Sequence, residues 1–553
     1  MKTFKTMAVL FLLMFSGGYA YSQGEITPQN GNITFAFQDF GIPGQGYALL
    51  LERSFNSMSG YFGKFGHKWG TNFDQHFKVT PEGTVEITSF GGGFKTIFTA
   101  KNFTPQTVDQ FVDDLWNRLP AASRSEKLKK SLLTDESLRH KLAGEHKLLR
   151  DIPFDIELSS TARGPEVLKK IKDTEGKIVW IRSYADGSKE YYDVQGKLTK
   201  VEDLNKNFLL YKYNPQGQLM SVTDAVGRRV TFEYNTMGLV SKIIPPAGSP
   251  CEYRYSADKD LIYAKNSNGF EFKYAYKKHH LIEVQYVAGG QKEIMKYDDK
   301  DRVIYHEGPN KEEKRKVRYD HKGNEDKFLE VTLTTERGSK HNPQINVKKY
   351  EFEYARRKDG FKFARKTVTV VDGIRIETVN SECCGKPLSI ERQGQITRFE
   401  YYEDGSLKSK ASPNGKKVEV EYDKSSQKVS KVTQTEAKTK KVDVTEYKYK
   451  NGNMVFARNK TLKISLQVDY YKRGQTRSIV DQDGRKFLFE YNEFGLPTRI
   501  TQVGVGSLVV SYNAKGEMLG MDSPSGRNIA AAVAQAFETV IDIIRPAGID
   551  LNI

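Results

Sequence analysis

The sequence has little cysteine and no long hydrophobic run. Only 3 of its 553 residues are cysteines, which excludes a scaffold held together by disulfides. The mean hydropathy is −0.60 and no run of about 18 apolar residues occurs, which excludes a protein that spans a membrane several times. Tryptophan is also scarce, with 3 residues, whereas 30 tyrosines and 31 phenylalanines accompany 46 glycines. This composition opposes disorder and favours short strands joined by tight turns.

The first twenty residues have the features of a secretory signal peptide. Lys2 and Lys5 form a basic start, Met7–Phe15 is apolar, and Gly18 and Ala20 are small residues at a cleavage site. The apolar run is too short to cross about 30 Å of hydrocarbon as a helix. We therefore expect an exported protein, located in a periplasm, at the cell surface or outside the cell, without a transmembrane segment after the signal is removed.

Tyrosine recurs with a period of 21 residues, which indicates a repeat architecture. The first series is Tyr192, Tyr213, Tyr234, Tyr255, Tyr276 and Tyr297; after an irregular middle the period returns at Tyr401 and Tyr422, and then at Tyr449, Tyr470, Tyr491 and Tyr512. Glycines follow many of them by four and by fourteen residues, as Gly217 and Gly227 follow Tyr213. Two glycines in each period predict two turns, and therefore two strands, in each repeat.

The strand that leads into each tyrosine alternates between apolar and polar residues. Arg229–Tyr234, Lys417–Tyr422 and Lys486–Tyr491 all place their apolar residues and the tyrosine on one face and charged residues on the other. Such a pattern is typical of antiparallel strands that are buried on one side. Because one hairpin could not bury its aromatic face alone, we expect the repeats to pack side by side.

These repeats resemble the YD repeats of the rearrangement-hotspot (Rhs) family. The resemblance rests on Tyr213–Leu219, Val222–Arg228, Asp481–Arg485 and Tyr491–Leu496, and on Arg53–Ser57 and Gly60–Trp69, which resemble the block that precedes YD repeats. It implies a β-sheet wound as a spiral or shell, as in the toxin-enclosing cages of this family. In those toxins an effector domain follows the repeats and is released by aspartyl self-cleavage. Here only 26 residues follow Arg527, too few for an effector enzyme, and we interpret Asp522 as a turn residue.

We therefore predict a mainly β protein, a YD-repeat antiparallel sheet wound as a partial shell or spiral, with a small helical insert and a C-terminal helix. Within the insert, apolar spacing predicts one helix up to Leu119 and two more in 123–149; Asn528–Ile544 would be the terminal helix and cap the last strand. The predicted organisation is 1–20 signal peptide, 21–100 N-terminal Rhs-type β region, 101–170 helical insert and linker, 171–526 YD-repeat sheet, and 527–553 C-terminal helix and tail.

The length of the sheet limits its shape. About 16 repeats would give some 32 strands and a ribbon of roughly 150 Å at about 4.8 Å per strand. Wound once, this ribbon makes a ring about 50 Å across; wound twice, it leaves little interior. We expect a partial shell or short spiral with its aromatic face inward, and not a large closed cage.

The sequence motifs assign no catalytic, cofactor-binding or metal-binding residue. No Gly-rich phosphate loop, GxSxG elbow or HExxH motif occurs, and the protein is predicted not to be an enzyme. The His279–His280 pair is interpreted as a solvated turn in preference to a metal site. Cys383–Cys384 could ligate a metal or form an adjacent disulfide, but two free or locally oxidised thiols are the preferred interpretation. Cys251 is predicted to be a buried free thiol.

The net charge of the chain indicates which partners it could bind. The chain carries a formal charge of +17, with basic runs such as Lys314–Arg318, yet acids are interleaved with them, which disfavours nucleic acid. We expect a polysaccharide, protein or anionic surface as partner. Two functions stay open: an exported non-enzymatic scaffold that binds or shields a ligand, and a toxin-delivery carrier whose effector is encoded separately.

Overall fold

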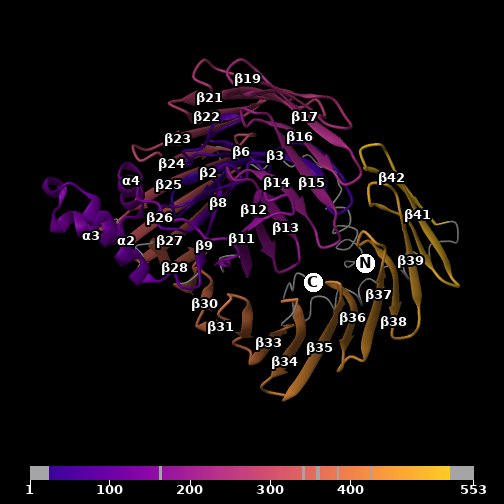
Figure 1. The fold of residues 1–553 in the computed structure, drawn as a ribbon. Helices are drawn as coiled ribbons and strands as arrows, with labels where there is room; N and C mark the ends of the chain where they lie inside the picture. Colours follow the sequence, from indigo (N-terminus) through magenta and orange to yellow (C-terminus); the bar gives the residue numbers. More distant parts are fainter. Residues whose placement is uncertain are drawn as a thin grey trace.

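In a computed structural model, the protein is a long antiparallel ribbon of strands coiled about a small N-terminal sheet (Figure 1). The structure describes residues 24–160, 165–324, 326–338, 343–356, 362–382, 385–423 and 426–523. The predicted signal peptide, the predicted terminal helix and the Cys383–Cys384 pair lie outside these residues.

The N-terminal region forms a sheet of its own. Its four strands pair in the order β1 (Glu25–Thr27), β2 (Asn32–Ile42), β3 (Leu49–Asn56) and β6 (Trp69–Thr71). A short hairpin, β4 (Phe62–Gly63) and β5 (Gly66–His67), lies between β3 and β6 in the chain. Every second residue of β3 is fully buried, so burial alternates along the strand as expected for a strand that packs on one face.

The ribbon pairs each strand with the next along the chain from β7 to β42. It begins with β7 (His76–Val79), β8 (Val85–Ser89), β9 (Phe94–Ala100), β10 (Leu158–Ser160), β11 (Glu166–Lys172), β12 (Ile178–Tyr184), β13 (Lys189–Tyr192), β14 (Leu198–Glu202), β15 (Phe208–Tyr213), β16 (Leu219–Asp224), β17 (Arg229–Tyr234), β18 (Val240–Ile244), β19 (Cys251–Tyr255), β20 (Leu261–Lys265), β21 (Glu271–Lys277) and β22 (His280–Tyr286). It continues with β23 (Gln291–Tyr297), β24 (Val303–Glu307), β25 (Glu313–Asp320), β26 (Phe328–Arg337), β27 (Gln344–Arg356), β28 (Lys362–Val371), β29 (Ile374–Asn380), β30 (Pro387–Arg392), β31 (Gln395–Tyr401) and β32 (Leu407–Ala411). It ends with β33 (Lys416–Tyr422), β34 (Val429–Glu436), β35 (Lys441–Lys450), β36 (Asn453–Asn459), β37 (Ile464–Tyr470), β38 (Thr476–Asp481), β39 (Lys486–Tyr491), β40 (Pro497–Gln502), β41 (Gly506–Tyr512) and β42 (Met518–Asp522).

Each repeat tyrosine lies at the end of a strand or one residue before it and is preceded by a β-bulge. In β17 the register shifts between Glu233 and Tyr234, Val230 and Phe232 are buried, and Tyr234 is half-buried, so the predicted faces are confirmed. The Tyr234 hydroxyl donates to the carbonyl of Leu219 in the previous repeat, 2.9 Å away. The same hydrogen bond to the previous repeat is made by Tyr213, Tyr255, Tyr297, Tyr319, Tyr401, Tyr422, Tyr449, Tyr470 and Tyr512. The tyrosines therefore link each repeat to the one before it.

The turns define two rims of the ribbon. We call the turns that directly follow the repeat tyrosines, such as Asn214–Gln218, the tyrosine rim, and the turns at the opposite ends of the strands, such as Asp203–Asn207, the distal rim. In both kinds of turn an Asp or Asn side chain accepts backbone N–H groups two and four residues on, as in Asx turns.

The ribbon coils into a spiral, as predicted. Asn205 on the distal rim hydrogen-bonds Asn453, 248 residues later, and Asn268 hydrogen-bonds Lys515, 247 residues later. Both contacts span 21 strands, or roughly 100 Å of ribbon at about 4.8 Å per strand, which corresponds to a coil about 32 Å across. The bridge His76–Lys197 joins β7 to the β13–β14 turn, but no ladder joins β42 to β7 in the described residues, so the ribbon as a whole is not closed.

Two separate cores line the spiral. The first joins the N-terminal sheet to strands β7–β27, and the second joins β33–β41. We call β10–β28 the first coil and β33–β42 the second coil. The helical insert has a third core and consists of α2 (Pro105–Arg118), α3 (Glu126–Thr134) and α4 (Glu136–Glu145), close to the helices predicted there. No helix in the described part of the chain is long and apolar enough to span a membrane.

Candidate functional site

The interior of the first coil is filled by the N-terminal sheet. The ring of Phe37 in β2 lies 5.0 Å from Phe272 and 5.8 Å from Tyr274, and Trp69 in β6 donates from Nε1 to the hydroxyl of Tyr276 at 2.8 Å. In Figure 1 the indigo strands β2, β3 and β6 lie inside the curve of the magenta strands. A sheet packed on both faces needs about 20 Å, so a coil about 32 Å across has room for this sheet and for little else.

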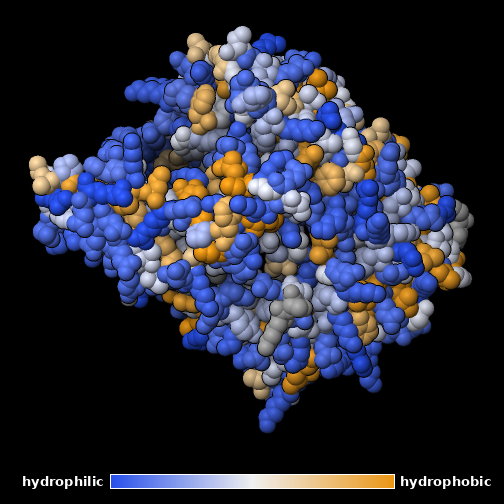
Figure 2. All heavy atoms as spheres, in the orientation of Figure 1, coloured by the Kyte–Doolittle hydropathy of each residue, from blue (hydrophilic) through white to orange (hydrophobic). Residues whose placement is uncertain are grey.

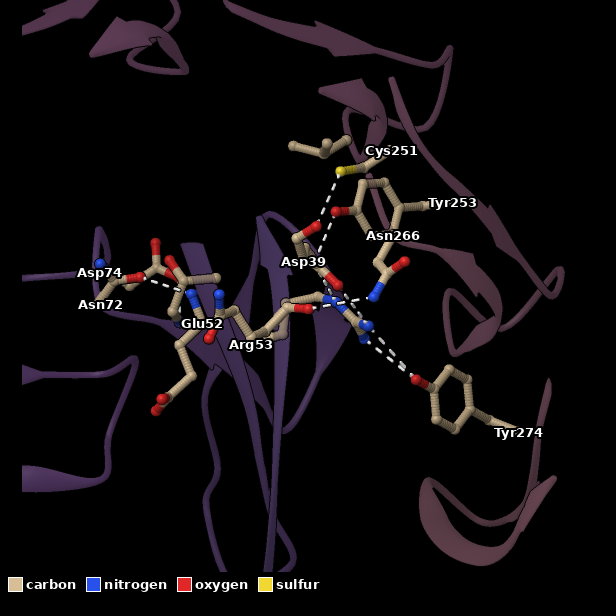
Figure 3. Close-up of polar contacts among 12 residues, drawn as sticks. Asp39, Glu52, Arg53, Asn72, Asp74, Cys251, Tyr253, Asn266 and Tyr274 are labelled. Carbon is tan, nitrogen blue, oxygen red and sulfur yellow. Dashed lines mark hydrogen bonds and ion pairs between the residues drawn. The ribbon is translucent and has the colours of Figure 1, made fainter. Parts of the chain in front are cut away.

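A buried ion pair fastens this sheet to the coil (Figure 3). Arg53 on β3 binds Asp39 on β2 with two hydrogen bonds, Nε to Oδ2 at 2.6 Å and Nη2 to Oδ1 at 3.0 Å. The coil supplies the remaining partners: the Tyr253 hydroxyl donates to Asp39 at 2.7 Å, and the Tyr274 hydroxyl lies 3.4 Å from both terminal nitrogens of Arg53. Both charged side chains are fully buried, so each depends on these partners.

Aromatic rings surround the guanidinium of Arg53. Its central carbon lies 5.0 Å from the ring centre of Trp69 and 5.4 Å from those of Phe37 and Tyr253, distances at which cation–π attraction operates. Burial by itself lowers the pKa of Arg53, but the charge of Asp39 raises it well above its usual value. Burial and Asp39 together also raise the pKa of Tyr253. Arg53 is therefore charged and Tyr253 is a neutral hydrogen-bond donor.

A second buried polar cluster fastens the first described residues of the chain. Glu293 on β23 and His306 on β24 are almost fully buried, and His306 Nε2 lies 2.7 Å from Glu293 Oε2. Glu293 also accepts hydrogen bonds from the Tyr286 hydroxyl at 2.5 Å and from the backbone N–H of Gly24 at 3.2 Å. The Gly24 carbonyl accepts from Arg315 Nη1 at 2.7 Å. The N-terminal region is thus tied to the coil at two places, at Gly24 and at the Asp39–Arg53 pair, by buried or half-buried polar groups.

The residues singled out from the sequence are distributed over the structure. Cys251 is a free thiol that is completely buried, as predicted, and its Sγ lies 3.6 Å from the carbonyl of Asp39. His279 lies in the β21–β22 turn with a positive φ of 62°, so the predicted turn is confirmed for this residue, whereas His280 begins β22. In the described residues no group of three or more His, Cys, Asp or Glu side chains could hold a metal ion.

The His279 turn is packed more closely than a solvated turn. The ring centre of His279 lies 3.8 Å from that of His67 on the β4–β5 hairpin, and His279 Nδ1 lies 2.9 Å from Asp260. His280 is paired with Asp301 at 2.9 Å. This contact of the N-terminal hairpin with the tyrosine rim was not expected from the sequence.

Asp522 does not lie in a turn. It ends β42 and is paired with Val509 of β41, ten residues after Tyr512, just as β18 ends ten residues after Tyr234. Its strand is mostly exposed. The basic run Lys314–Arg318 lies on β25, where Arg315 and Arg337 of β26 both bind Glu313, as expected for charges interleaved with acids.

The buried polar partners were missed by the sequence analysis, although signals were present. Asp39 interrupts an otherwise apolar and amide-containing strand, and an acid at such a position needs a buried cation. Arg53 was noted only as part of a motif. Glu293 carries a similar signal, because it lies four residues before Tyr297, at the inward position that Val230 occupies before Tyr234.

Two family models match the chain. One, described as RHS Repeat, matches residues 213–250, and one described as a domain of unknown function, DUF6531, matches residues 23–92. The second range contains the whole N-terminal sheet and the start of the ribbon. Residues 213–250 therefore match an Rhs repeat, and the resemblance of the repeats to the Rhs family is confirmed.

Solved structures of Tc toxin complexes are similar to the chain at low sequence identity. The crystal structure of TcdB2-TccC3-Cdc42 is 10% identical with a TM-score of 0.42, covering 93% of this chain and 35% of that one. The crystal structure of TcdB2-TccC3-TEV is 10% identical with a TM-score of 0.39, covering 93% and 38%. The Photorhabdus luminescens Tc holotoxin pore is 9% identical with a TM-score of 0.32, covering 95% and 42%. The chain thus spans between about a third and two fifths of these structures. No curated protein matches it.

Proposed function

We propose that the protein is an exported, non-enzymatic scaffold that binds a ligand on its outer surface, at or outside the cell envelope. The observation that carries this proposal is the filled interior of the first coil. Phe37, Arg53 and Trp69 of the N-terminal sheet occupy the concave face against which an enclosed ligand would pack. The outer face of the ribbon is then the large surface left for a partner, and Figure 2 shows that the visible side of the molecule is largely hydrophilic.

The outer face carries a recurring pair of a cation and an aromatic ring. It is formed by the residue directly before a repeat tyrosine and the residue paired with it on the next strand. Arg254 lies 4.5 Å from the ring centre of Tyr263, and Lys296 lies 5.3 Å from that of Tyr305. The same pairing is made by Lys200 with Tyr191 and by Lys448 with Phe456. These rings are half-exposed.

A ring beside a cation suits an acidic polysaccharide. The ring can pack on the apolar face of a sugar while the cation binds a carboxylate or sulfate, and the positive net charge of the chain, +17, attracts an anionic polymer. We therefore favour an acidic polysaccharide as the ligand, with a protein partner as the outcome to be distinguished.

Binding to immobilised polysaccharides tests the proposal. The full chain is expected to bind alginate or heparin and not dextran, and to bind less at 0.5 M than at 0.1 M salt because surface charges are screened. The variant Arg254→Ala with Tyr263→Ala should weaken binding by about tenfold, a loss of about 1.4 kcal/mol. Lys242→Ala, at a paired position without a ring, is the matched control. Equal binding of dextran and alginate, or no binding to any of them, would contradict the proposal.

A carrier for a separately encoded effector is the second candidate. It is supported by the assignment to the Rhs family and by the second core, which contains no residue of the N-terminal sheet. Co-expression with small proteins encoded beside its gene tests it. A carrier would protect such a protein from added protease until the shell is unfolded, whereas a surface scaffold would leave it susceptible.

A further inference from the structure

The ribbon contains a stretch without a core between its two coils. No described residue between Val368 and Val418 is a buried apolar side chain. Strands β29, β30 and β31 lie in this stretch, and their ladders are nevertheless continuous. Bending a sheet here disturbs backbone hydrogen bonds but separates few apolar contacts, so these strands resist deformation less than their neighbours do.

The two coils meet along a line of polar contacts, which we call the seam. It brings the distal rim of the first coil against the tyrosine rim of the second. Asn205 and Asn453 exchange two side-chain hydrogen bonds, at 2.8 and 3.3 Å. Asn207 donates to the carbonyl of Arg473 at 3.0 Å, and Lys515 donates to Asn268 at 3.0 Å. Such exposed or half-buried hydrogen bonds exchange readily with water.

The loop between β2 and β3 of the N-terminal sheet also enters the seam. Gln45, in the loop between β2 and β3, donates to the carbonyl of Glu493 at 3.3 Å and accepts from Arg473 Nη1 at 2.8 Å. Both partners belong to the second coil. Gln45 therefore connects the block that fills the first coil directly to the second.

The apolar part of the seam consists of a few side chains, among them Leu204 of the first coil, which lies against Gly452. Pro43 approaches Gly516 so closely that any side chain at Gly516 would collide with it, and Arg228 lies 5.0 Å from the ring centre of Phe494. Neither Pro43 nor Phe494 is part of the two large cores. Separation of the coils along this line would leave both cores intact.

We propose that the second coil opens as one body, with β29–β31 as the hinge and the seam as the latch. Opening exposes the distal rim of the first coil, and it disturbs backbone hydrogen bonds only in the hinge strands. This inference does not depend on the proposed polysaccharide ligand, because it rests on the two cores, the stretch without a core and the polar seam alone.

Hydrogen exchange of the full chain, read by mass spectrometry, tests the hinge and the latch together. In the unmodified protein the amides of β29–β31 should exchange at least about tenfold faster than those of β15–β17, since local opening is easier where the core is absent. The variant Gln45→Ala with Asn453→Ala should accelerate exchange by about tenfold in β29–β31 and at the seam turns, and leave β15–β17 unchanged. Gln291→Ala, which removes a side-chain hydrogen bond to Asn310 within the first coil, is the matched control and should not affect β29–β31.

A crosslink provides the converse test. Asn205→Cys with Asn453→Cys, in a chain that also carries Cys383→Ser and Cys384→Ser, should be bridged across the seam by a short bis-methanethiosulfonate reagent, because the paired Asn side chains hold the two backbones farther apart than a direct disulfide spans. Bridging should slow exchange in β29–β31, and reduction of the bridge should restore it. The proposal is overturned if the hinge strands exchange as slowly as β15–β17, if the seam variant accelerates exchange evenly along the chain, or if the bridged and reduced forms of the double cysteine variant exchange alike.

Discussion

The Arg53–Asp39 pair makes the attachment of the N-terminal sheet testable by a double-mutant cycle. Arg53→Met removes the cation but leaves Asp39 buried, with Tyr253 as its remaining side-chain donor. Removing one member of a buried ion pair costs about 3–5 kcal/mol, because the other charge loses its partner. Asp39→Leu should cost a similar amount, since it leaves Arg53 buried among aromatic rings without its carboxylate.

The double variant should be much less unstable than the two single variants suggest. With both charges replaced by apolar side chains of similar volume, the site loses its buried ions together, and such replacements are often neutral or stabilising. We expect the double variant to lie within about 2 kcal/mol of the original protein, which corresponds to a coupling of several kcal/mol between the two positions.

Trp69 is a suitable reporter, because its ring lies 5.0 Å from the Arg53 guanidinium and the chain has only 3 tryptophans. Urea unfolding would be followed by Trp69 fluorescence in a background with Trp116→Phe and Trp180→Phe. If the double variant is destabilised by the sum of the single effects, the two residues do not act as a pair and our account of this attachment is wrong.

Three further predictions concern single side chains. Tyr234→Ala should destabilise the protein by about 3 kcal/mol and Tyr234→Phe by about 1 kcal/mol, whereas Lys417→Ala on the exposed face should change stability by less than about 0.5 kcal/mol; thermal melts that show equal shifts would mean the faces are misassigned. Cys251 should not react with a thiol reagent at pH 8 until the protein is unfolded, because burial raises the pKa of its thiol. Burial and the neighbouring His279 lower the pKa of His67 below 6.5 in the folded protein. As the pH falls, His67 is therefore protonated in the unfolded chain before it is protonated in the folded protein. Stability should therefore decrease below about pH 6.5, and His67→Asn should reduce that decrease in melting temperature.

The repeat and its faces could be predicted from the sequence because they are local properties. The 21-residue period and the alternation in Arg229–Tyr234 follow from neighbouring residues, and so does the helical spacing that predicts α2. The bulge before each tyrosine was not visible, since a two-residue alternation continues through it without a change in the pattern. The seam could not be predicted either, because Asn205 and Asn453 are ordinary turn and strand residues until the diameter of the coil brings them together.

Where the 21-residue period is lost, other residues make the side-chain hydrogen bond to the previous repeat. Tyr319 follows Tyr297 by 22 residues, yet its hydroxyl still donates to the previous repeat, to Val303 at 2.8 Å. At the position of a missing tyrosine, the Asn380 side chain donates to the carbonyl of Ala364 at 2.9 Å and is preceded by the same bulge. The hydrogen bond to the previous repeat is therefore kept in a repeat that has lost its tyrosine.

The bulges and the tyrosine hydrogen bonds together explain how a sheet of this length takes a narrow diameter. A bulge bends the strand that carries it and increases its twist, and in this ribbon it recurs at the same rim in nearly every repeat. The tyrosine then fixes each bulged strand to the previous repeat at that rim, so the bends add in one direction. Between β25 and β27 the ladders run without a register shift and the strands are among the longest, with 10 and 13 residues in β26 and β27. Curvature is thus set repeat by repeat, and the coil that results is wide enough for one sheet, which the chain supplies from its own N-terminal residues.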